Sequence, residues 1–292
     1  MKVIGTGLTG LVGSRIVELN PDIEFINVSI ETGISILDPL QLEKVFIDNP
    51  DAEAVLHLAA FTDTNAAWDQ KGDESGLCYQ LNVVGTQNIV NLCQKYGKYL
   101  VHISTDYVFD GQKTTPYTEE DPTSAIEWYG ETKAMAEKVV TDSGINTSIV
   151  RLAFPYRAKY DPKVDIVRKI KVKIENGDTL NLFDDQITTP TFIDDIAAGL
   201  KVFFDQKPTG IYHLVGSSSQ SPYDLGIMIA DVFNLDKSKI NASKLSDYLK
   251  TENARPFAPN AALSNDKVKA LGITMKTLRE GLEEMKKQIE HE

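Results

Sequence analysis

Two residues four apart in the middle of the chain, Tyr129 and Lys133, have the types and the spacing to transfer a proton. Residues four apart lie on the same face of a helix. A phenol is a poor acid or base at neutral pH because its pKa is about 10, and an ammonium group one helical turn away lowers that pKa by favouring the phenolate. The chain has 11 tyrosines, so the pair alone also fits an exposed surface pair. Its meaning depends on what surrounds it.

A hydroxyl-bearing segment and a glycine-rich turn give the pair that context. Ser104-Thr105-Asp106 follows an apolar run of strand length. Gly7, Gly10 and Gly13 lie between a short apolar run and a helical pattern, where the first glycine allows a sharp turn, the second a close approach to a pyrophosphate and the third tight packing of helix on strand. A helix N-terminus also attracts phosphate. The alternative is a structural turn, but the strand before it and the helix after it favour a dinucleotide site.

Strand-length apolar runs alternate with helical patterns, which predicts an α/β fold of Rossmann type with a doubly wound parallel sheet. The expected strands are Met1–Ile4, Ile23–Val28, Ala54–Leu58, Tyr99–Ser104 and Ser148–Leu152, with helices at 39–48, 83–96 and 130–142. Ligands of such sheets bind at the carboxyl ends of the strands. The residues that follow each strand are therefore the candidate contacts.

The strict alternation ends near Arg151, which predicts two domains. We expect residues 1–150 to form the dinucleotide-binding domain and residues 151–292 to form mainly a smaller, substrate-binding domain. A helix from Phe192-Ile193 to Phe204 and a strand at Ile211–Val215 should bring the segment 190–215 back to the main sheet. Further helices are expected near 222–233 and 277–289.

A basic segment opens the second domain. The pattern predicts a helix from Asp161-Pro162 to Asn176-Gly177, with Val164 on its buried face. Seven basic residues lie on or just before it, with acidic Asp161 and Asp165 near its start, and they are Arg157, Lys159, Lys163, Arg168, Lys169, Lys171 and Lys173. They could bind the phosphates of a nucleotide or form a solvated helix face, and the sequence leaves both interpretations open.

Composition sets limits on function. A net charge of −12 over 292 residues argues against a general role on nucleic acids or membrane surfaces, since both are polyanions. The two cysteines, Cys78 and Cys93, have no metal-ligand spacing and fit a reducing compartment. The N-terminus goes directly into a strand, and the sequence has no apolar run of membrane-spanning length. We therefore expect a soluble cytoplasmic protein without a metal.

Charge also bears on the cofactor. No Lys or Arg lies between Arg15 and Lys44, whereas six acidic residues lie from position 18 to 43, namely Glu18, Asp22, Glu24, Glu31, Asp38 and Glu43. A 2′-phosphate in this region would lack a counter-charge. The cofactor is expected to be NADPH or NADH, and local charge favours NADH.

The glycine turn, Ser104-Thr105-Asp106 and the Tyr129/Lys133 pair together resemble the extended short-chain dehydrogenase/reductase family. Within it, the segment 101–111 (VHISTDYVFDG) followed by 129–133 (YGETK) is similar to the dTDP-4-dehydrorhamnose reductase branch. The similarity covers most of the chain and includes Asp185-Gln186, Thr189-Pro190-Thr191 and Arg255-Pro256.

The resemblance implies a role for each matching residue. Thr105 would hydrogen-bond the substrate carbonyl, Tyr129 would protonate it, and Lys133 would hold the cofactor ribose and lower the pKa of Tyr129. Asn82 would order a proton-relay water. The expected cofactor contacts are Gly7, Thr9, Gly10, Leu11, Val12, Asp38, Leu58, Ala59, Ala60, Thr62, Tyr129, Lys133 and Phe154. The expected substrate contacts are Thr105, Asp106, Val108, Phe109, Tyr156, Gln186, Thr189 and Arg255.

The resemblance implies reduction of a 4-keto nucleotide sugar, with dTDP-4-dehydrorhamnose giving dTDP-L-rhamnose as the first candidate. Tyr107 stands where related dehydratases have a glutamate that removes a ring proton, which favours reduction over dehydration. Phe154 replaces the usual Trp and Thr188 the usual Gly of this branch, which leaves open a reductase or epimerase of another nucleotide sugar. A third hypothesis is a non-catalytic, dinucleotide-binding regulatory subunit similar to the methionine adenosyltransferase beta subunit. A homodimer is left open.

Overall fold

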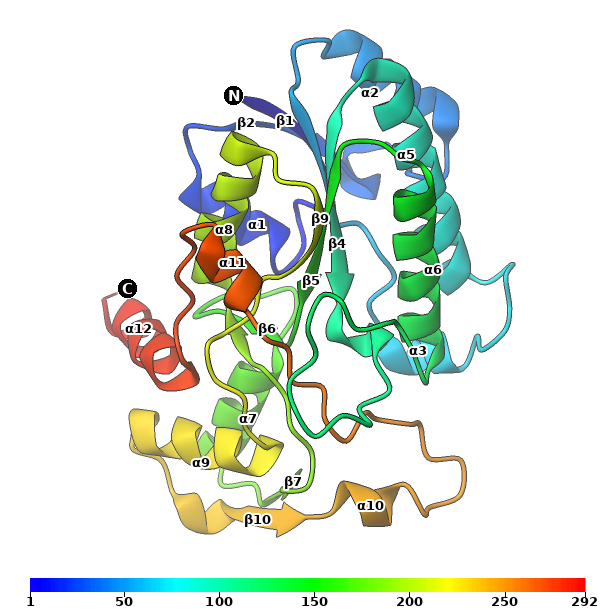
Figure 1. The fold of residues 1–292 in the computed structure, drawn as a ribbon. Helices are drawn as coiled ribbons and strands as arrows, with labels where there is room; N and C mark the ends of the chain where they lie inside the picture. Colours follow the sequence, from blue (N-terminus) through cyan, green and yellow to red (C-terminus); the bar gives the residue numbers. More distant parts are fainter. Residues whose placement is uncertain (292) are drawn as a thin grey trace.

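A computed structural model describes residues 1–291 and shows a central sheet flanked by helices on both faces (Figure 1). In this part of the chain the sheet has six parallel strands in the order β2-β1-β3-β4-β5-β9. The strands are β1 (Lys2–Thr6), β2 (Glu24–Val28), β3 (Ala54–His57), β4 (Tyr99–Thr105), β5 (Thr147–Leu152) and β9 (Gly210–His213). The doubly wound α/β fold predicted from the alternating pattern is confirmed.

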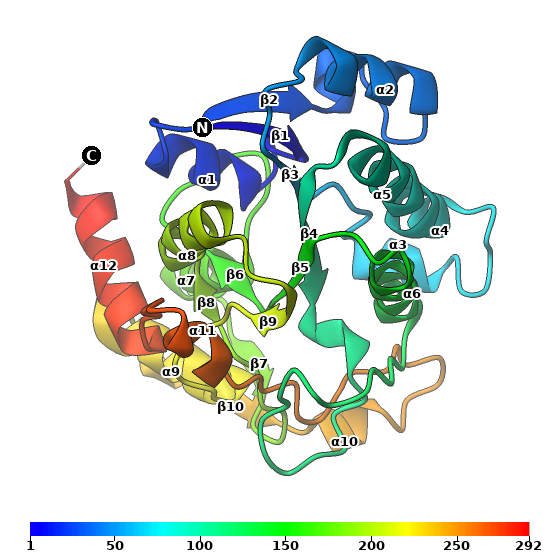
Figure 2. The same ribbon diagram turned by 45° about the horizontal axis from the view of Figure 1, so that its top comes forward.

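The two helix layers follow from the alternation of side chains along each strand. On β1, Val3 packs into the apolar core shared with α1 (Gly13–Leu19) and α8 (Ile193–Gln206). Its neighbour Ile4 packs into the core on the other face. Figure 2 shows α1 and α8 on one side of the sheet and α2 (Pro39–Asp48), α5 (Gly85–Tyr96) and α6 (Trp128–Asp142) on the other. Both faces are therefore covered, as buried parallel strands require.

Short helices connect these elements, and a π-helical turn precedes α5. The short helices of this half are η1 (Ile30–Thr32), α3 (Thr64–Trp68), α4 (Leu77–Tyr79) and η3 (Asp106–Val108). The π-helical turn η2 (Gln80–Val84) lies where the sequence pattern predicts the start of a regular helix. Gly97 closes α5 in the left-handed conformation that is common at helix ends.

The remaining elements surround a separate apolar core. Two small parallel pairs are β6 (Pro155–Tyr156) with β8 (Thr191–Phe192) and β7 (Leu180–Phe183) with β10 (Ile240–Ser243). The helices are α7 (Ile166–Glu175), α9 (Pro222–Phe233), η4 (Lys237–Lys239), α10 (Leu245–Tyr248), α11 (Asp266–Ala270) and α12 (Leu278–Glu290). This core joins α7, α9 and α12 and includes fully buried Tyr156. No helix among residues 1–291 combines the length and the apolar character needed to cross a bilayer.

The predicted start of the helix in the basic segment is wrong. α7 begins at Ile166 rather than at Asp161-Pro162, because the Asp165 carboxylate caps it by accepting a hydrogen bond from the backbone N–H of Arg168 at 3.0 Å. Val164, expected on the buried face, is 55% exposed. Residues 157–165 are therefore an irregular segment that precedes the helix.

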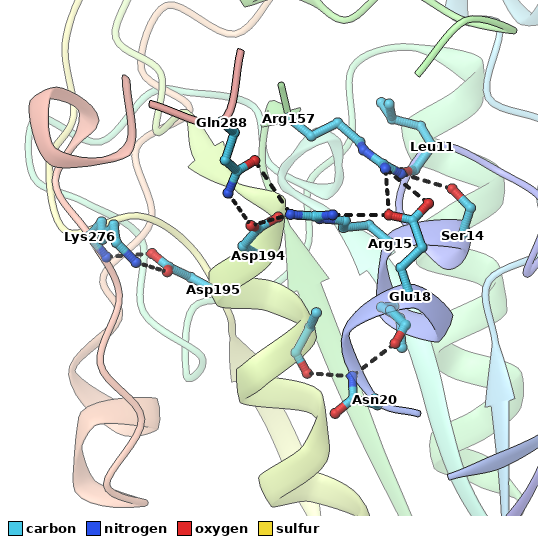
Figure 3. Close-up of polar contacts among 12 residues, drawn as sticks. Leu11, Ser14, Arg15, Glu18, Asn20, Arg157, Asp194, Asp195, Lys276 and Gln288 are labelled. Carbon is cyan, nitrogen blue, oxygen red and sulfur yellow. Dashed lines mark hydrogen bonds and ion pairs between the residues drawn. The ribbon is translucent and has the colours of Figure 1, made fainter. Parts of the chain in front are cut away.

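A polar network joins α1 to α8 and α12 (Figure 3). The Arg15 guanidinium donates from Nε and Nη2 to the two carboxylate oxygens of Asp194, at 2.7 Å each. Gln288 of α12 donates to the same carboxylate at 2.7 Å. Because Arg15 and Asp194 pair through two parallel bonds, the network fixes the orientation of α1 as well as its position.

A buried ion pair lies under the carboxyl end of the sheet. Arg151 on β5 donates from Nε and Nη2 to Glu137 on α6 at 2.9 and 2.7 Å, and Ser104 on β4 donates to the same carboxylate at 2.5 Å. Arg151 is 1% exposed and Glu137 is 4% exposed. The network ties α6 to β4 and β5, the elements that carry Tyr129, Lys133 and Thr105.

Removing one member of this pair should destabilise the fold strongly. We expect Arg151→Met to lower the free energy of unfolding by about 3–5 kcal/mol, because it leaves Glu137 as an unpaired buried charge. Urea denaturation measures this change. The double variant Arg151→Met/Glu137→Met should recover part of the loss, and a double variant less stable than the single one would contradict this account.

Candidate active site

A cavity with a volume of about 700 Å³ lies at the carboxyl ends of β1, β3 and β4. Its wall combines the glycine turn after β1, the segment Ser29–Ile36 after β2, the loop after β3 and the ends of β4 and β5. This is the edge at which doubly wound sheets bind their ligands. The volume lies within the range of cofactor and small-molecule sites.

Two glycines of the turn, Gly7 and Gly13, are packed too tightly to be replaced by a residue with a side chain. Gly7 has a φ of +70°, and a Cβ there would approach the backbone nitrogen of Ala59 to 2.8 Å. A Cβ at Gly13 would lie 2.5 Å from the Gly7 carbonyl oxygen. The turn is thus pressed against the loop after β3, and the two backbones together form the cavity wall. This cradle of small residues fits a dinucleotide.

The first turn of α6 places the catalytic candidates. Glu127 caps the helix, with its carboxylate accepting from the backbone N–H groups of Gly130 at 2.5 Å and Tyr129 at 3.2 Å. A Cβ at Gly130 would lie 2.1 Å from the carbonyl oxygen of Tyr107. Since only a glycine permits this approach, α6 lies close against the end of β4, and Tyr129 and Lys133 both line the cavity.

The environment of Tyr129 raises the pKa of its phenol. Burial is the main cause, and the nearby Asp106 carboxyl adds to it, while the Thr105 hydroxyl facing the phenol acts in the opposite direction. Lys133 is not among the causes of this shift, and the expectation that it lowers the pKa of Tyr129 stays a prediction. Tyr129 is therefore held as a neutral phenol, the form that can donate a proton.

Lys133 occupies a buried position. Its Nζ donates to the Ile103 carbonyl oxygen at 2.7 Å, and the residue is 3% exposed. Burial lowers the pKa of this ammonium to about 8, and the Glu137 carboxylate one turn along α6 opposes the shift. Near neutral pH the group is therefore mostly protonated and remains a hydrogen-bond donor at the cavity wall.

Asp106 is a buried carboxyl with one unpaired oxygen. Its Oδ1 accepts from the Thr105 hydroxyl at 2.9 Å, whereas Oδ2 is buried without a hydrogen-bond partner in the described structure. Burial raises its pKa to about 7. Such a group is typical of functional sites, because it costs stability that only a ligand can return.

A much smaller cavity of about 20 Å³ adjoins the first beyond Tyr107. Glu127 lines this cavity, and Arg255 Nη1 lies 3.8 Å from Glu127 Oε2. The Arg255 guanidinium also stacks on Phe257, 4.1 Å from the ring centre. This space holds about one water molecule rather than a sugar ring, so a sugar placed here would have to displace the segment 256–258.

The structure brings together most of the residues expected at the cofactor. Those that line the large cavity are Gly7, Thr9, Gly10, Leu11, Val12, Leu58, Ala59, Ala60, Thr62, Tyr129, Lys133 and Phe154. Asp38 was expected at the cofactor but does not line this cavity. Its carboxylate caps α2 by accepting hydrogen bonds from the backbone N–H groups of Leu40 and Gln41. The acidic residue that lines the cavity after β2 is Glu31.

The expected substrate residues divide into two groups. Thr105, Asp106, Phe109 and Gln186 line one or both cavities, and Arg255 lies beside the smaller one. Three expected contacts are instead structural. Tyr156 packs in the core between α7, α9 and α12, Val108 is the fully buried last residue of η3, and the Thr189 hydroxyl hydrogen-bonds Ser219 and accepts from the Leu263 N–H.

Asn82 uses its side-chain amide for structure. Its Oδ1 accepts from the Phe61 N–H at 2.8 Å and its Nδ2 donates to the Thr132 hydroxyl at 2.9 Å. The residue lies in the π-helical turn before α5 and joins the loop after β3 to α6. Its expected contact with a relay water remains a prediction.

Four residues of the site were missed from the sequence. Glu127 was missed as a helix cap because the residues that usually cap helices are Ser, Thr, Asp and Asn. Glu31 was counted only as one of several acids. Lys163 lies in a segment predicted to be a helix, and Tyr160 lies just before that segment. The only sequence signal for Lys163 was that it belongs to the basic segment. That signal did not indicate that Lys163 lies at the cavity.

The fold and this site place the chain among the extended short-chain dehydrogenases/reductases, which are NAD(P)-dependent oxidoreductases. The chain belongs to the RmlD substrate binding domain family, whose model matches residues 1–291. The cofactor is accordingly a nicotinamide dinucleotide.

Similar proteins have different activities. A probable low-salt glycan biosynthesis reductase of Haloferax volcanii is 31% identical over 81% of this chain and 77% of its own length. The methionine adenosyltransferase 2 subunit beta of Mus musculus is 30% identical over 97% of this chain and 86% of its own. A crystal structure of dTDP-4-dehydrorhamnose reductase from Bacillus anthracis in complex with NADP has a TM-score of 0.87 at 25% identity, covering 98% and 99% of the two chains.

The buried Asp106 predicts a pH-dependent cost to stability. Its pKa is about 7 in the folded protein against 3.8 for an unperturbed aspartic acid, so the wild type loses stability as pH rises through this window. We expect Asp106→Asn to raise the free energy of unfolding at pH 8 by up to about 4 kcal/mol, with the gain shrinking toward pH 5. Urea denaturation at both pH values tests this, and an equal effect at both would contradict it.

Proposed function

We propose that this protein reduces the keto group of a nucleotide sugar, with dTDP-4-dehydrorhamnose as the first substrate to test. The observation that supports this most is the convergence of Tyr129, Lys133 and Thr105 on the wall of a dinucleotide-sized cavity. Tyr107, rather than a carboxylate, follows Asp106 at this point, which favours reduction over removal of a ring proton. The names of the relatives described above support a sugar-nucleotide substrate.

In this proposal the residues of the chain stabilise and protonate a carbonyl oxygen. The bound nicotinamide would supply the hydride. Thr105 would hold the carbonyl oxygen through its hydroxyl, and Tyr129 would transfer its phenolic proton to that oxygen as negative charge develops. Lys133, whose ammonium lies in the same wall, would stabilise the phenolate that remains.

Tyr129→Phe should abolish most turnover without loss of cofactor. Removing the proton donor is expected to lower kcat by about 10²- to 10⁴-fold. The assay follows NADH or NADPH oxidation at 340 nm with a panel of 4-keto nucleotide sugars, and dinucleotide binding is measured separately by fluorescence. Tyr96→Phe, which alters a surface phenol on α5, is the matched control. Turnover retained in Tyr129→Phe would refute the assigned role.

A second candidate is a dinucleotide-binding regulatory subunit. Two observations favour it: the similarity to the methionine adenosyltransferase 2 subunit beta extends over 97% of this chain, and the space beside Tyr107 has a volume of only about 20 Å³. The same assay separates the two functions. Tight binding of a dinucleotide with no oxidation by any sugar of the panel would favour the regulatory function. A reductase or epimerase of another nucleotide sugar would instead respond to one member of the panel.

We also propose that NADH is preferred over NADPH. The cavity wall after β2 contains Ser29 and Glu31, and a carboxylate there would repel a 2′-phosphate while accepting hydrogen bonds from a free ribose hydroxyl. The Bacillus anthracis relative was crystallised with NADP, so this proposal rests on Glu31 of this chain and not on that relative.

Glu31→Gln should shift the preference toward NADPH. We expect the ratio of the Kd values for NADPH and NADH to fall by about 5- to 10-fold, because one repulsive charge is removed. Titration of protein fluorescence with each cofactor measures both constants. Glu24→Gln, on the exposed start of β2, should leave the ratio unchanged, and an unchanged ratio in Glu31→Gln as well would remove Glu31 from the specificity site.

A further inference from the structure

The irregular segment between β6 and α7, residues 157–165, is anchored at its start to the first helix. Arg157 donates to the Ser14 hydroxyl at 2.9 Å and to the Glu18 carboxylate at 2.8 Å (Figure 3). A weaker bond at 3.4 Å reaches the Leu11 carbonyl oxygen in the glycine turn. Arg157 is 6% exposed, so this end of the segment is fixed on the N-terminal domain. We call residues 157–165 the strap.

The strap contacts two segments of the cavity wall. The Tyr160 hydroxyl donates to the Thr9 carbonyl oxygen in the glycine turn at 2.6 Å. The Lys163 ammonium donates to the Thr62 hydroxyl in the loop after β3 at 3.1 Å. All four residues line the large cavity. The strap therefore bridges the glycine turn and the loop after β3, the two adjoining backbones that form the wall of the cavity.

One arginine of α7 holds the strap in this shape. Arg168 donates to the carbonyl oxygens of Tyr160 at 2.7 Å and Lys163 at 2.5 Å, and its Nε donates to Asp165 at 2.6 Å. These bonds hold the backbone of both residues that reach across the cavity. Arg168, one of the basic residues counted in the sequence, thus contacts strap backbone and strap carboxylate.

The basic residues around the cavity indicate which part of a ligand the strap would contact. Among the described residues that line the cavity, only Lys133 and Lys163 are basic, in a chain with a net charge of −12. Lys133 is committed to the catalytic wall through Ile103. Lys163 has a neutral hydroxyl partner and an exposed side chain. An ammonium with a replaceable partner at the mouth of an anion-binding cavity is suited to a phosphate.

We propose that the strap closes over the pyrophosphate of a bound dinucleotide, with Lys163 as its counter-charge and Arg168 as the residue that positions the strap. On binding, the ammonium exchanges the Thr62 hydroxyl for a phosphate oxygen, while Tyr160 keeps the strap on the glycine turn. The proposal rests on the proposed function only for the identity of the bound cofactor.

Binding of NADH and of adenosine, measured by calorimetry on the full chain, tests this. Lys163→Met should weaken NADH binding about 10-fold and flatten its dependence on salt concentration, because one ionic contact is lost. Adenosine, which has no phosphate, should bind Lys163→Met as it binds the wild type. Lys169→Met removes the same charge from an exposed position on α7 and should leave NADH affinity within twofold of the wild type.

Arg168→Gln tests the positioning role by a different measurement. Stopped-flow displacement of NADH should show faster dissociation in this variant, with adenosine affinity unchanged. Equal NADH affinities in Lys163→Met and Lys169→Met would overturn the proposal, as would a loss of adenosine binding equal to the loss of NADH binding. Absence of sugar-dependent NADH oxidation, with the Lys163 effect on binding intact, would refute the reductase and leave the strap established.

Discussion

The close approach of α6 to the end of β4 is the constraint on which the site depends. At Gly130 the two backbones lie so near that a single added carbon would collide with the Tyr107 carbonyl oxygen. That contact fixes the positions of Tyr129 and Lys133 relative to Thr105. The Glu127 cap holds one end of this stretch of α6, and the Glu137–Arg151 pair holds the other. The relative positions of the catalytic candidates therefore depend first on how the backbones pack.

The same stretch concentrates groups that are costly to bury. Asp106 has an unpaired oxygen and Lys133 has a depressed pKa. Phe154, at the junction of the two cavities, has a φ of +41°, a strained value for an aromatic residue. A strained backbone and a buried carboxylate oxygen without a partner, close together, are typical of a site that favours ligand binding over stability. The apolar cores on the two faces of the sheet supply the rigidity that keeps these groups in place.

Much of this architecture could be predicted from the sequence, because strand alternation and glycine spacing are local signals. The bounds of α2 and α9, the edge strand β9 and the place of the glycine turn in the cavity wall follow from such signals. The start of α7 could not, since Val164 continues the helical spacing although it is exposed. Tyr156 and Asp38 were misplaced for a related reason: a motif gives the neighbourhood of a side chain, but its direction depends on tertiary packing.

The ion pair of Arg15 has a consequence for how the chain is made. Its carboxylate partner lies 179 residues further along, and Gln288, which completes the group, lies 273 residues away. During synthesis on the ribosome the first helix therefore emerges long before the residues that fix it. Contacts of such long sequence separation slow folding because a long loop must close before they form, so α1 cannot complete its contacts before α8 and α12 have been synthesised.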